Sequence, residues 1–205
     1  MFTLKILKII VKYISLASIS ISAALIFNST LVLMRMIDTK SVNQTQSPEW
    51  YAFYAIFIAS LFEELIFRGL IYKGLYKLIK KPVIPILVSS FLFGIYHLNL
   101  PQFIYAFGMG LIFGFCYYKY KKIDVPYLMH VAANAATLFI PMLIPFNNVI
   151  AVITSAICTC FITVPLYILA KMGENENVKD FEERGRITDC ESAEGGIGSG
   201  GEEVE

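Results

Sequence analysis

Two adjacent glutamates and one arginine lie inside a strongly apolar stretch, LFEELIFRGL, at residues 61–70. In a helix, Glu64 and Arg68 are four residues apart and share one face, where they can form an ion pair. Glu63 lies about 100° away round the helix, so it faces different surroundings without that partner. A carboxyl group in apolar surroundings suits a residue that takes up and releases a proton near neutral pH. Glu63 is therefore the candidate general base, supported by Glu64 and Arg68; the alternative is one buried ion cluster that locks helix packing.

The two histidines of the chain, His97 and His130, also fall within predicted helices. Phe93 precedes His97 by four residues, so its ring shares the face of the imidazole and can fix its rotamer. Asn134 follows His130 by four residues, which puts two hydrogen-bond donors on one stripe of a helix. Each histidine alone is also explained as a packing residue. Together, these residues predict a site that one glutamate, two imidazoles and one amide form from three helices.

Such a site has the groups that peptide hydrolysis needs, without a side-chain nucleophile. Glu63, assisted by His97, can orient and deprotonate a water molecule. His130 and Asn134 can donate hydrogen bonds to the developing oxyanion, at about 3 to 4 kcal/mol per donor. A rival interpretation makes Glu63 and the two histidines zinc ligands with one open position. The chain lacks the H-E-x-x-H spacing that holds two imidazoles on one helical face, so we predict no cofactor and keep zinc as the alternative.

The elements that must position these residues are predicted to span a membrane. Hydrophobic residues make up 57% of the 205 residues, and the mean hydropathy is +0.64, outside the usual soluble range. A crossing needs about 20 apolar residues. Tyr13–Met34 and Trp50–Tyr72 suit one crossing each, whereas Pro82–Tyr118 and Val125–Ala170 suit two each, with turns at HLNLPQ and PMLIPFNN. The sequence thus predicts an all-α, polytopic membrane protein with about six transmembrane helices.

Lysines set the predicted orientation, because short cytoplasmic loops carry an excess of positive charge. Every second predicted loop or terminus is basic, which places both termini in the cytoplasm. By depth counting along straight helices, His97 lies too far from the cytoplasmic surface to meet Glu63 and His130. We therefore expect the hairpin after the second helix to extend into the headgroup region, with the site in the cytoplasmic half. The lysines concerned are Lys5, Lys8, Lys12, Lys73, Lys77, Lys80, Lys81, Lys119, Lys121, Lys122 and Lys171.

The chain divides into two parts by composition. Residues 1–171 form the predicted transmembrane, protease-like domain, whose first helix we interpret as an uncleaved segment rather than a signal peptide. Residues 172–205 hold eleven of the sixteen acidic residues and many glycines, which predicts a disordered cytoplasmic tail. Gly110 and Gly114 form a GxxxG pattern, for which we expect tight helix packing.

Three segments in order, EELIFRG, FGIYH and HVAAN, resemble the EExxxR, FxxxH and HxxxN motifs of the CAAX protease and bacteriocin-processing family, also called the CPBP or Abi family. The resemblance runs from about residue 60 to 138 and includes the intervening glycine-rich helix. It implies an intramembrane glutamic endopeptidase, similar to the type II CAAX prenyl endopeptidases. The implied roles are Glu63 as general base, His97 as the water-activating histidine, and His130 with Asn134 as oxyanion donors. Glu64 and Arg68 would support the site, and glutamate-activated water is favoured over zinc.

The resemblance also implies the setting. Archaeal and eukaryotic relatives remove the last three residues of prenylated CAAX proteins, but this chain has fewer predicted helices, which weakens that substrate. Short members are typically bacterial, with roles in bacteriocin processing, self-immunity and regulation of sensor kinases. We expect a multi-pass bacterial cell-membrane protein whose partners are lipid and a peptide or membrane-associated protein substrate, with no nucleic acid. The alternative is a non-catalytic binding protein for immunity or sensor-kinase regulation.

Overall fold

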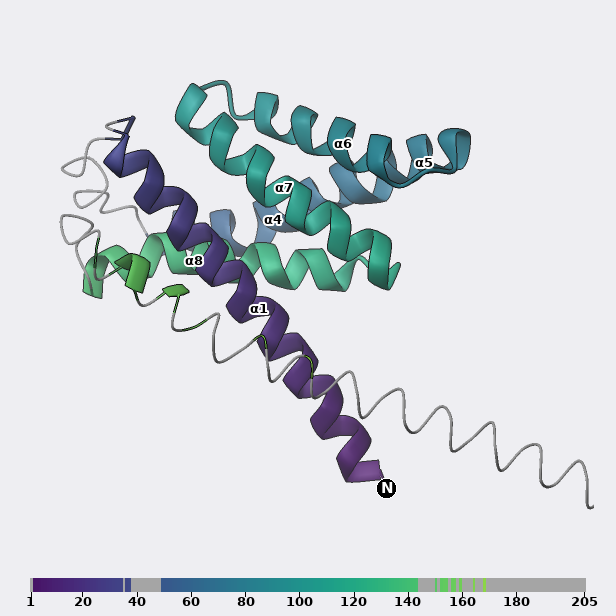
Figure 1. Ribbon diagram of the computed structural model, residues 1–205, viewed down its shortest axis with the longest axis horizontal. Helices are drawn as coiled ribbons and strands as arrows, with labels where there is room; N and C mark the ends of the chain where they lie inside the picture. The colour runs from purple at the N-terminus through teal and green to yellow at the C-terminus, as the bar shows by residue number, and fades with distance from the viewer. Residues whose placement is uncertain are drawn as a thin grey trace, which may run out of the picture.

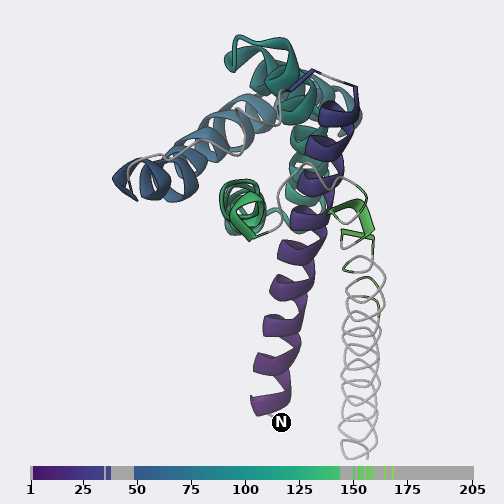
Figure 2. The same ribbon diagram turned by 90° about the vertical axis from the view of Figure 1, so that its left-hand side faces the viewer.

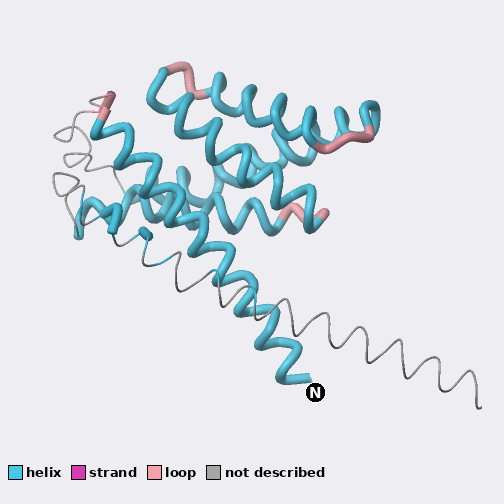
Figure 3. The backbone as a smooth tube through the Cα atoms, viewed as in Figure 1, coloured by secondary structure: helices cyan, strands magenta, loops and turns pink. Residues whose placement is uncertain are grey.

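In the computed structural model the described residues are 2–34, 36–37, 49–143 and scattered positions between 150 and 168, and they are mostly helical, with short turns between the helices. No strand occurs in these ranges, which confirms the all-α class (Figure 3). Most of the second crossing predicted within 125–170 lies outside the described residues, and the predicted tail at 172–205 lies wholly outside them. The elements are α1 (Phe2–Leu33), α3 (Glu49–Phe53), η1 (Tyr54–Ala59), α4 (Ser60–Glu64), η2 (Leu65–Tyr72), α5 (Lys73–Ile79), α6 (Val83–Tyr96), α7 (Leu100–Tyr120) and α8 (Asp124–Leu143).

The segment from Glu49 to Ile79 runs as one helix that alternates between α- and π-helical geometry. Five of its buried positions form a stripe with a spacing of four residues, and Phe67 is buried beside it. In an α-helix four residues advance about 400°, so such a stripe drifts by about 40° per repeat. The π-helical stretches η1 and η2 hold more residues per turn and offset this drift, so the stripe stays on one side. Its members are Ile56, Ser60, Glu64, Arg68 and Tyr72.

α6, α7 and α8 pack against this helix, and α1 packs on α7 and α8. α6 and α7 form a hairpin, and its turn lies within the predicted HLNLPQ segment. The Asn99 side chain caps α7 by accepting a hydrogen bond of 2.9 Å from the Gln102 backbone N–H. α8 contacts α1, η1, α4 and α7, and Figures 1 and 2 show it crossing α1. The Ser20 hydroxyl donates to the Met129 carbonyl over 2.6 Å, which ties α1 to α8 one residue before His130.

Within the part of the chain that the structure describes, two helices are long and apolar enough to cross a membrane, over Ile6–Leu33 and Leu100–Tyr120. The first contains most of the predicted Tyr13–Met34 crossing, although α1 itself begins at Phe2. Val83–Tyr96 is a shorter apolar helix. The count of six crossings and the cytoplasmic termini stay predictions.

The GxxxG pattern of α7 packs against α6, as the sequence predicted. A Cβ atom added to Gly110 would lie 3.0 Å from the Ser90 Cβ and 3.1 Å from its Cα, and one on Gly114 would lie 3.3 Å from the Ile86 side chain. The absence of a side chain on α7 therefore allows the backbones to approach closely.

Replacing Gly110 by alanine is expected to lower the melting temperature, because overpacking at a backbone contact costs about 1 to 3 kcal/mol. Gly74→Ala is the matched control, since the added Cβ meets nothing within 4 Å and alanine gains up to about 1 kcal/mol in helix propensity. Thermal unfolding of both variants in detergent checks this. Equal melting temperatures for the two would contradict close packing at Gly110.

Candidate active site

The predicted Glu64–Arg68 pair is present and completely buried. Arg68 Nη1 donates to Glu64 Oε1 over 2.9 Å, and both side chains are 0% exposed. Arg68 Nη2 donates to the Gly110 carbonyl of α7 over 3.1 Å. The guanidinium carbon lies 4.9 Å from the ring centre of Phe93 and 5.5 Å from that of Phe113, at cation–π distance. Arg68 thus links the 49–79 helix to α6 and α7 as well as neutralising Glu64.

His130 contacts both glutamates. Its Nδ1 lies 2.9 Å from Glu64 Oε1 and its Nε2 lies 3.5 Å from Glu63 Oε2. Ionised carboxylates only accept hydrogen bonds, and a neutral imidazole has a single N–H. One extra proton, on His130 or on Glu63, is therefore needed for both contacts to be favourable. That proton also balances the charge of two carboxylates and one guanidinium, which is important because buried net charge is costly.

Glu63 and Glu64 differ in exposure, although both contact His130. The Glu64 side chain is 0% exposed, whereas that of Glu63 is 15% exposed. Both histidines lie near enough to Glu63 to interact with its charge, and His130 Nε2 is 3.5 Å from Glu63 Oε2. A partly accessible carboxylate beside two imidazoles can exchange protons with a bound molecule.

His97 ends α6 and packs on Phe93, which confirms the predicted contact. The two ring centres are 5.1 Å apart at 81°, and Phe93 also lies against His130, at 5.6 Å and 78°. The ring of Phe93 therefore lies against both imidazoles, so His97 and His130 are near each other in the structure. The Nδ1 atom of His97 lies 2.9 Å from the Phe93 carbonyl, which can only accept. Nδ1 therefore carries the hydrogen, and in the neutral ring Nε2 is a free acceptor.

Asn134 points into the α4 side of the site. Its Nδ2 donates to the Ala55 carbonyl over 3.1 Å and to the Ser60 hydroxyl over 3.0 Å. Both amide hydrogens are thus engaged within the protein, so donation to an oxyanion requires exchange of one contact. Neither Ala55 nor Ser60 was predicted from the sequence as a partner of Asn134. One feature of the sequence could have pointed to Ser60 as a site residue, because it lies four residues before Glu64 and so on the same helical face.

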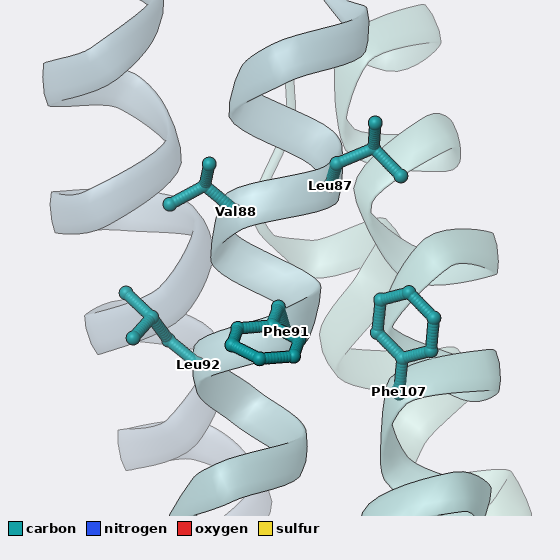
Figure 4. A pocket seen from close by; sticks show the side chains of 5 residues that line it. All are labelled: Leu87, Val88, Phe91, Leu92 and Phe107. Carbon is teal, nitrogen blue, oxygen red and sulfur yellow. The ribbon is translucent and has the colours of Figure 1, made fainter.

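Two further features bear on ligands. Among the described residues no group of three or more His, Cys, Asp or Glu side chains is arranged to hold a metal ion. A groove on α6 and α7 is lined only by apolar side chains and by none of the candidate site residues (Figure 4). It therefore adds no ionisable group to the site. Its lining is Leu87, Val88, Phe91, Leu92 and Phe107.

Fold and site together define an all-helical protein with an ionisable cluster buried between apolar helices. Residues 45–136 match the family model described as type II CAAX prenyl endopeptidase Rce1-like, and this range contains every candidate site residue. Over this range the chain is similar to the CAAX protease and bacteriocin-processing family.

Two curated bacterial proteins are similar over the same part. The membrane-embedded CAAX protease MroQ of Staphylococcus aureus (strain USA300) is 31% identical over 100 residues, covering 46% of this chain and 40% of the relative. YdiL of Bacillus subtilis (strain 168), provisionally named a membrane peptidase, is 35% identical over 77 residues, covering 38% and 31%. The chain thus spans less than half the length of either relative. No solved structure matches. Apolar helices and these relatives indicate a bacterial membrane protein.

Proposed function

We propose that the chain is a membrane endopeptidase that hydrolyses a peptide bond of a membrane-associated peptide or protein by glutamate-activated water. The observation that supports this most is the position of Glu63. Its carboxylate is 15% exposed and 3.5 Å from His130 Nε2, beside a Glu64–Arg68 pair that is fully buried. The similarity of residues 45–136 to the CAAX prenyl endopeptidase family model favours the same chemistry.

One protonation state satisfies both the charge balance and the chemistry. With His130 as imidazolium and Glu63 ionised, the cluster with Glu64 and Arg68 is neutral. The Nδ1–H of His130 then donates to Glu64, and its Nε2–H, only loosely held at 3.5 Å, is available to an oxyanion. This arrangement leaves Glu63 as the base.

In the proposed reaction Glu63 removes a proton from a water molecule that also donates to the free Nε2 of His97. The resulting hydroxide attacks the scissile carbonyl carbon, and the carbonyl oxygen becomes an oxyanion. His130 Nε2–H stabilises this charge, and Asn134 joins when it exchanges one of its present contacts. Glu63 then transfers its proton to the amide nitrogen as the C–N bond breaks, which leaves a carboxylic acid and an amine.

The membrane arrangement belongs to the same proposal: about six crossings, both termini in the cytoplasm and a site in the cytoplasmic half. For the substrate we propose CAAX-type or bacteriocin-type processing, in which the peptide reaches the site from the lipid. An apolar setting for the peptide agrees with the apolar residues next to Glu63, since Phe62, Leu65 and Ile66 are all exposed.

The test is a cleavage assay with the full chain in liposomes and a panel of membrane-associated peptides, with and without a prenyl group, read by mass spectrometry. We expect cleavage that a chelator leaves unchanged. Activity abolished by chelator and restored by zinc would overturn the glutamate mechanism in favour of the metal alternative. No cleavage of any peptide, together with a cellular phenotype that survives loss of Glu63, would favour the binding function.

A further inference from the structure

Three polar groups meet where η1 joins α4. Asn134 Nδ2 donates to the Ala55 carbonyl over 3.1 Å and to the Ser60 hydroxyl over 3.0 Å. The Ser60 hydroxyl donates in turn to the Ala55 carbonyl over 3.3 Å. Ser60 is 0% exposed. The hydroxyl therefore links a side chain of α8 to the backbone of η1.

The chemistry of this group fixes how the Asn134 amide is turned. The Ala55 carbonyl only accepts hydrogen bonds, so the nitrogen of the amide faces it and not the oxygen. The backbone N–H of Ser60 donates to the Phe57 carbonyl, so it does not compete for Ala55. The hydroxyl of Ser60 both accepts from Asn134 and donates to Ala55, which closes the network.

The same pair of helices is joined a second time, one turn away. Ser60 and Glu64 are four residues apart on one helix, and Asn134 and His130 are four apart on α8. Ser60 contacts Asn134 and Glu64 contacts His130, which is the pairing of two antiparallel helices in fixed register. At about 1.5 Å per residue the two contacts lie about 6 Å apart. Two such contacts prevent α8 from sliding or turning relative to the glutamates.

We propose that Ser60 is a positioning residue that orients the Asn134 amide and fixes the register of α8 against α4. This inference rests on the proposed function and assigns the reaction a residue outside the three motifs. Ser60 does not touch the substrate and acts only through Asn134. It holds the amide nitrogen of Asn134 in one orientation. When the oxyanion forms, the amide then has to give up only one of its two present hydrogen bonds in order to donate to it.

Ser60→Ala tests the proposal by steady-state kinetics. We expect kcat to fall by about tenfold to a hundredfold, because small misplacement of a catalytic group has effects of this size, while KM changes little. Ser60→Thr, which keeps the hydroxyl, should retain most of the activity. Ser89→Ala is the matched control, because Ser89 is 0% exposed and its hydroxyl donates to the Ile86 carbonyl of its own helix. Wild-type kcat in folded Ser60→Ala would overturn the proposal.

A double variant separates positioning from general structural damage. If Ser60 acts through Asn134, the double variant Ser60→Ala, Asn134→Ala has the kcat of Asn134→Ala alone. If adding Ser60→Ala to Asn134→Ala lowers kcat by as much as it does in the wild type, Ser60 has a role independent of Asn134, and the proposal is overturned.

The melting temperatures of the wild type, the two single variants Ser60→Ala and Asn134→Ala, and the double variant test the Ser60–Asn134 contact independently of any cleavage assay. We expect the double variant to lose less than the sum of the single losses, and additive losses would overturn the contact. If the wild type cleaves nothing, or Glu63→Gln leaves cleavage unchanged, the proposed function fails while this thermal result still decides whether Ser60 holds Asn134.

Discussion

Glu63→Gln is expected to lower kcat by about 10²- to 10⁴-fold, the range of general acid–base catalysis, without unfolding the protein. Glutamine keeps the size of the side chain but cannot take a proton from water. The melting temperature should stay level or rise, since Glu63 is partly exposed and its contact with His130 is long, at 3.5 Å. The measurements are kcat on the best peptide of the panel and thermal unfolding of the same preparation.

Glu64→Gln is the matched control, because it makes the same change at the adjacent residue. Glu64 is 0% exposed and contacts Arg68 and His130, both at 2.9 Å. Its loss should therefore lower the melting temperature clearly, unlike the change at Glu63. If both variants lose stability equally and Glu63→Gln keeps wild-type kcat, the cluster is structural only, which was the alternative that the sequence left open.

Local spacing was enough to predict the contacts made within one helix. The four-residue intervals from Glu64 to Arg68 and from Phe93 to His97 each gave a pair that the structure contains. The turn between α6 and α7 was also predictable, because Asn99 and Pro101 mark a helix start. These features depend on residues that are neighbours along the chain.

Contacts between residues far apart in the sequence were harder to predict. Glu63 was predicted to act with His97 on a water molecule, and the imidazole that it contacts in the structure is that of His130, 67 positions away. Both glutamates share this histidine because α8 lies in register with α4, and nothing local encodes that register. The amide of Asn134 likewise depends on Ala55, whose carbonyl lies in a π-helical stretch without a recognisable sequence pattern.

Depth counting along straight helices could not bring His97 to Glu63 for a related reason. It treated each helix as straight, upright and α-helical, so His97 and Glu63 came out at different levels. The structure has π-helical turns on both sides of α4 and places Phe93 against both imidazoles. Changes in pitch and in crossing angle follow from packing and cannot be read from residue counts. Whether the hairpin at Lys80 enters the headgroup region stays a prediction.

Arg68→Met is expected to give the largest loss of stability in the protein. Methionine has a similar length and no charge, so the variant leaves Glu64 buried without its main counter-charge. Removing one partner of a buried ion pair costs about 3 to 5 kcal/mol, which for a chain of this size corresponds to a fall of roughly 10 °C in melting temperature. The hydrogen bond to the Gly110 carbonyl is lost as well. Thermal unfolding in detergent, with peptide cleavage measured beside it, gives the result.

The double variant Glu64→Gln, Arg68→Met decides whether the charge itself is responsible. If the unpaired carboxylate causes the loss, removing it should restore a large part of the melting temperature, because a neutral pair has no charge to compensate. If the loss comes only from the packing of Arg68 on Phe93 and Phe113, at 4.9 and 5.5 Å, the second change restores nothing. Cleavage distinguishes the roles further: a stable double variant that stays inactive would show that Glu64 holds His130 in its catalytic orientation, since glutamine cannot stabilise the imidazolium that the proposed reaction uses.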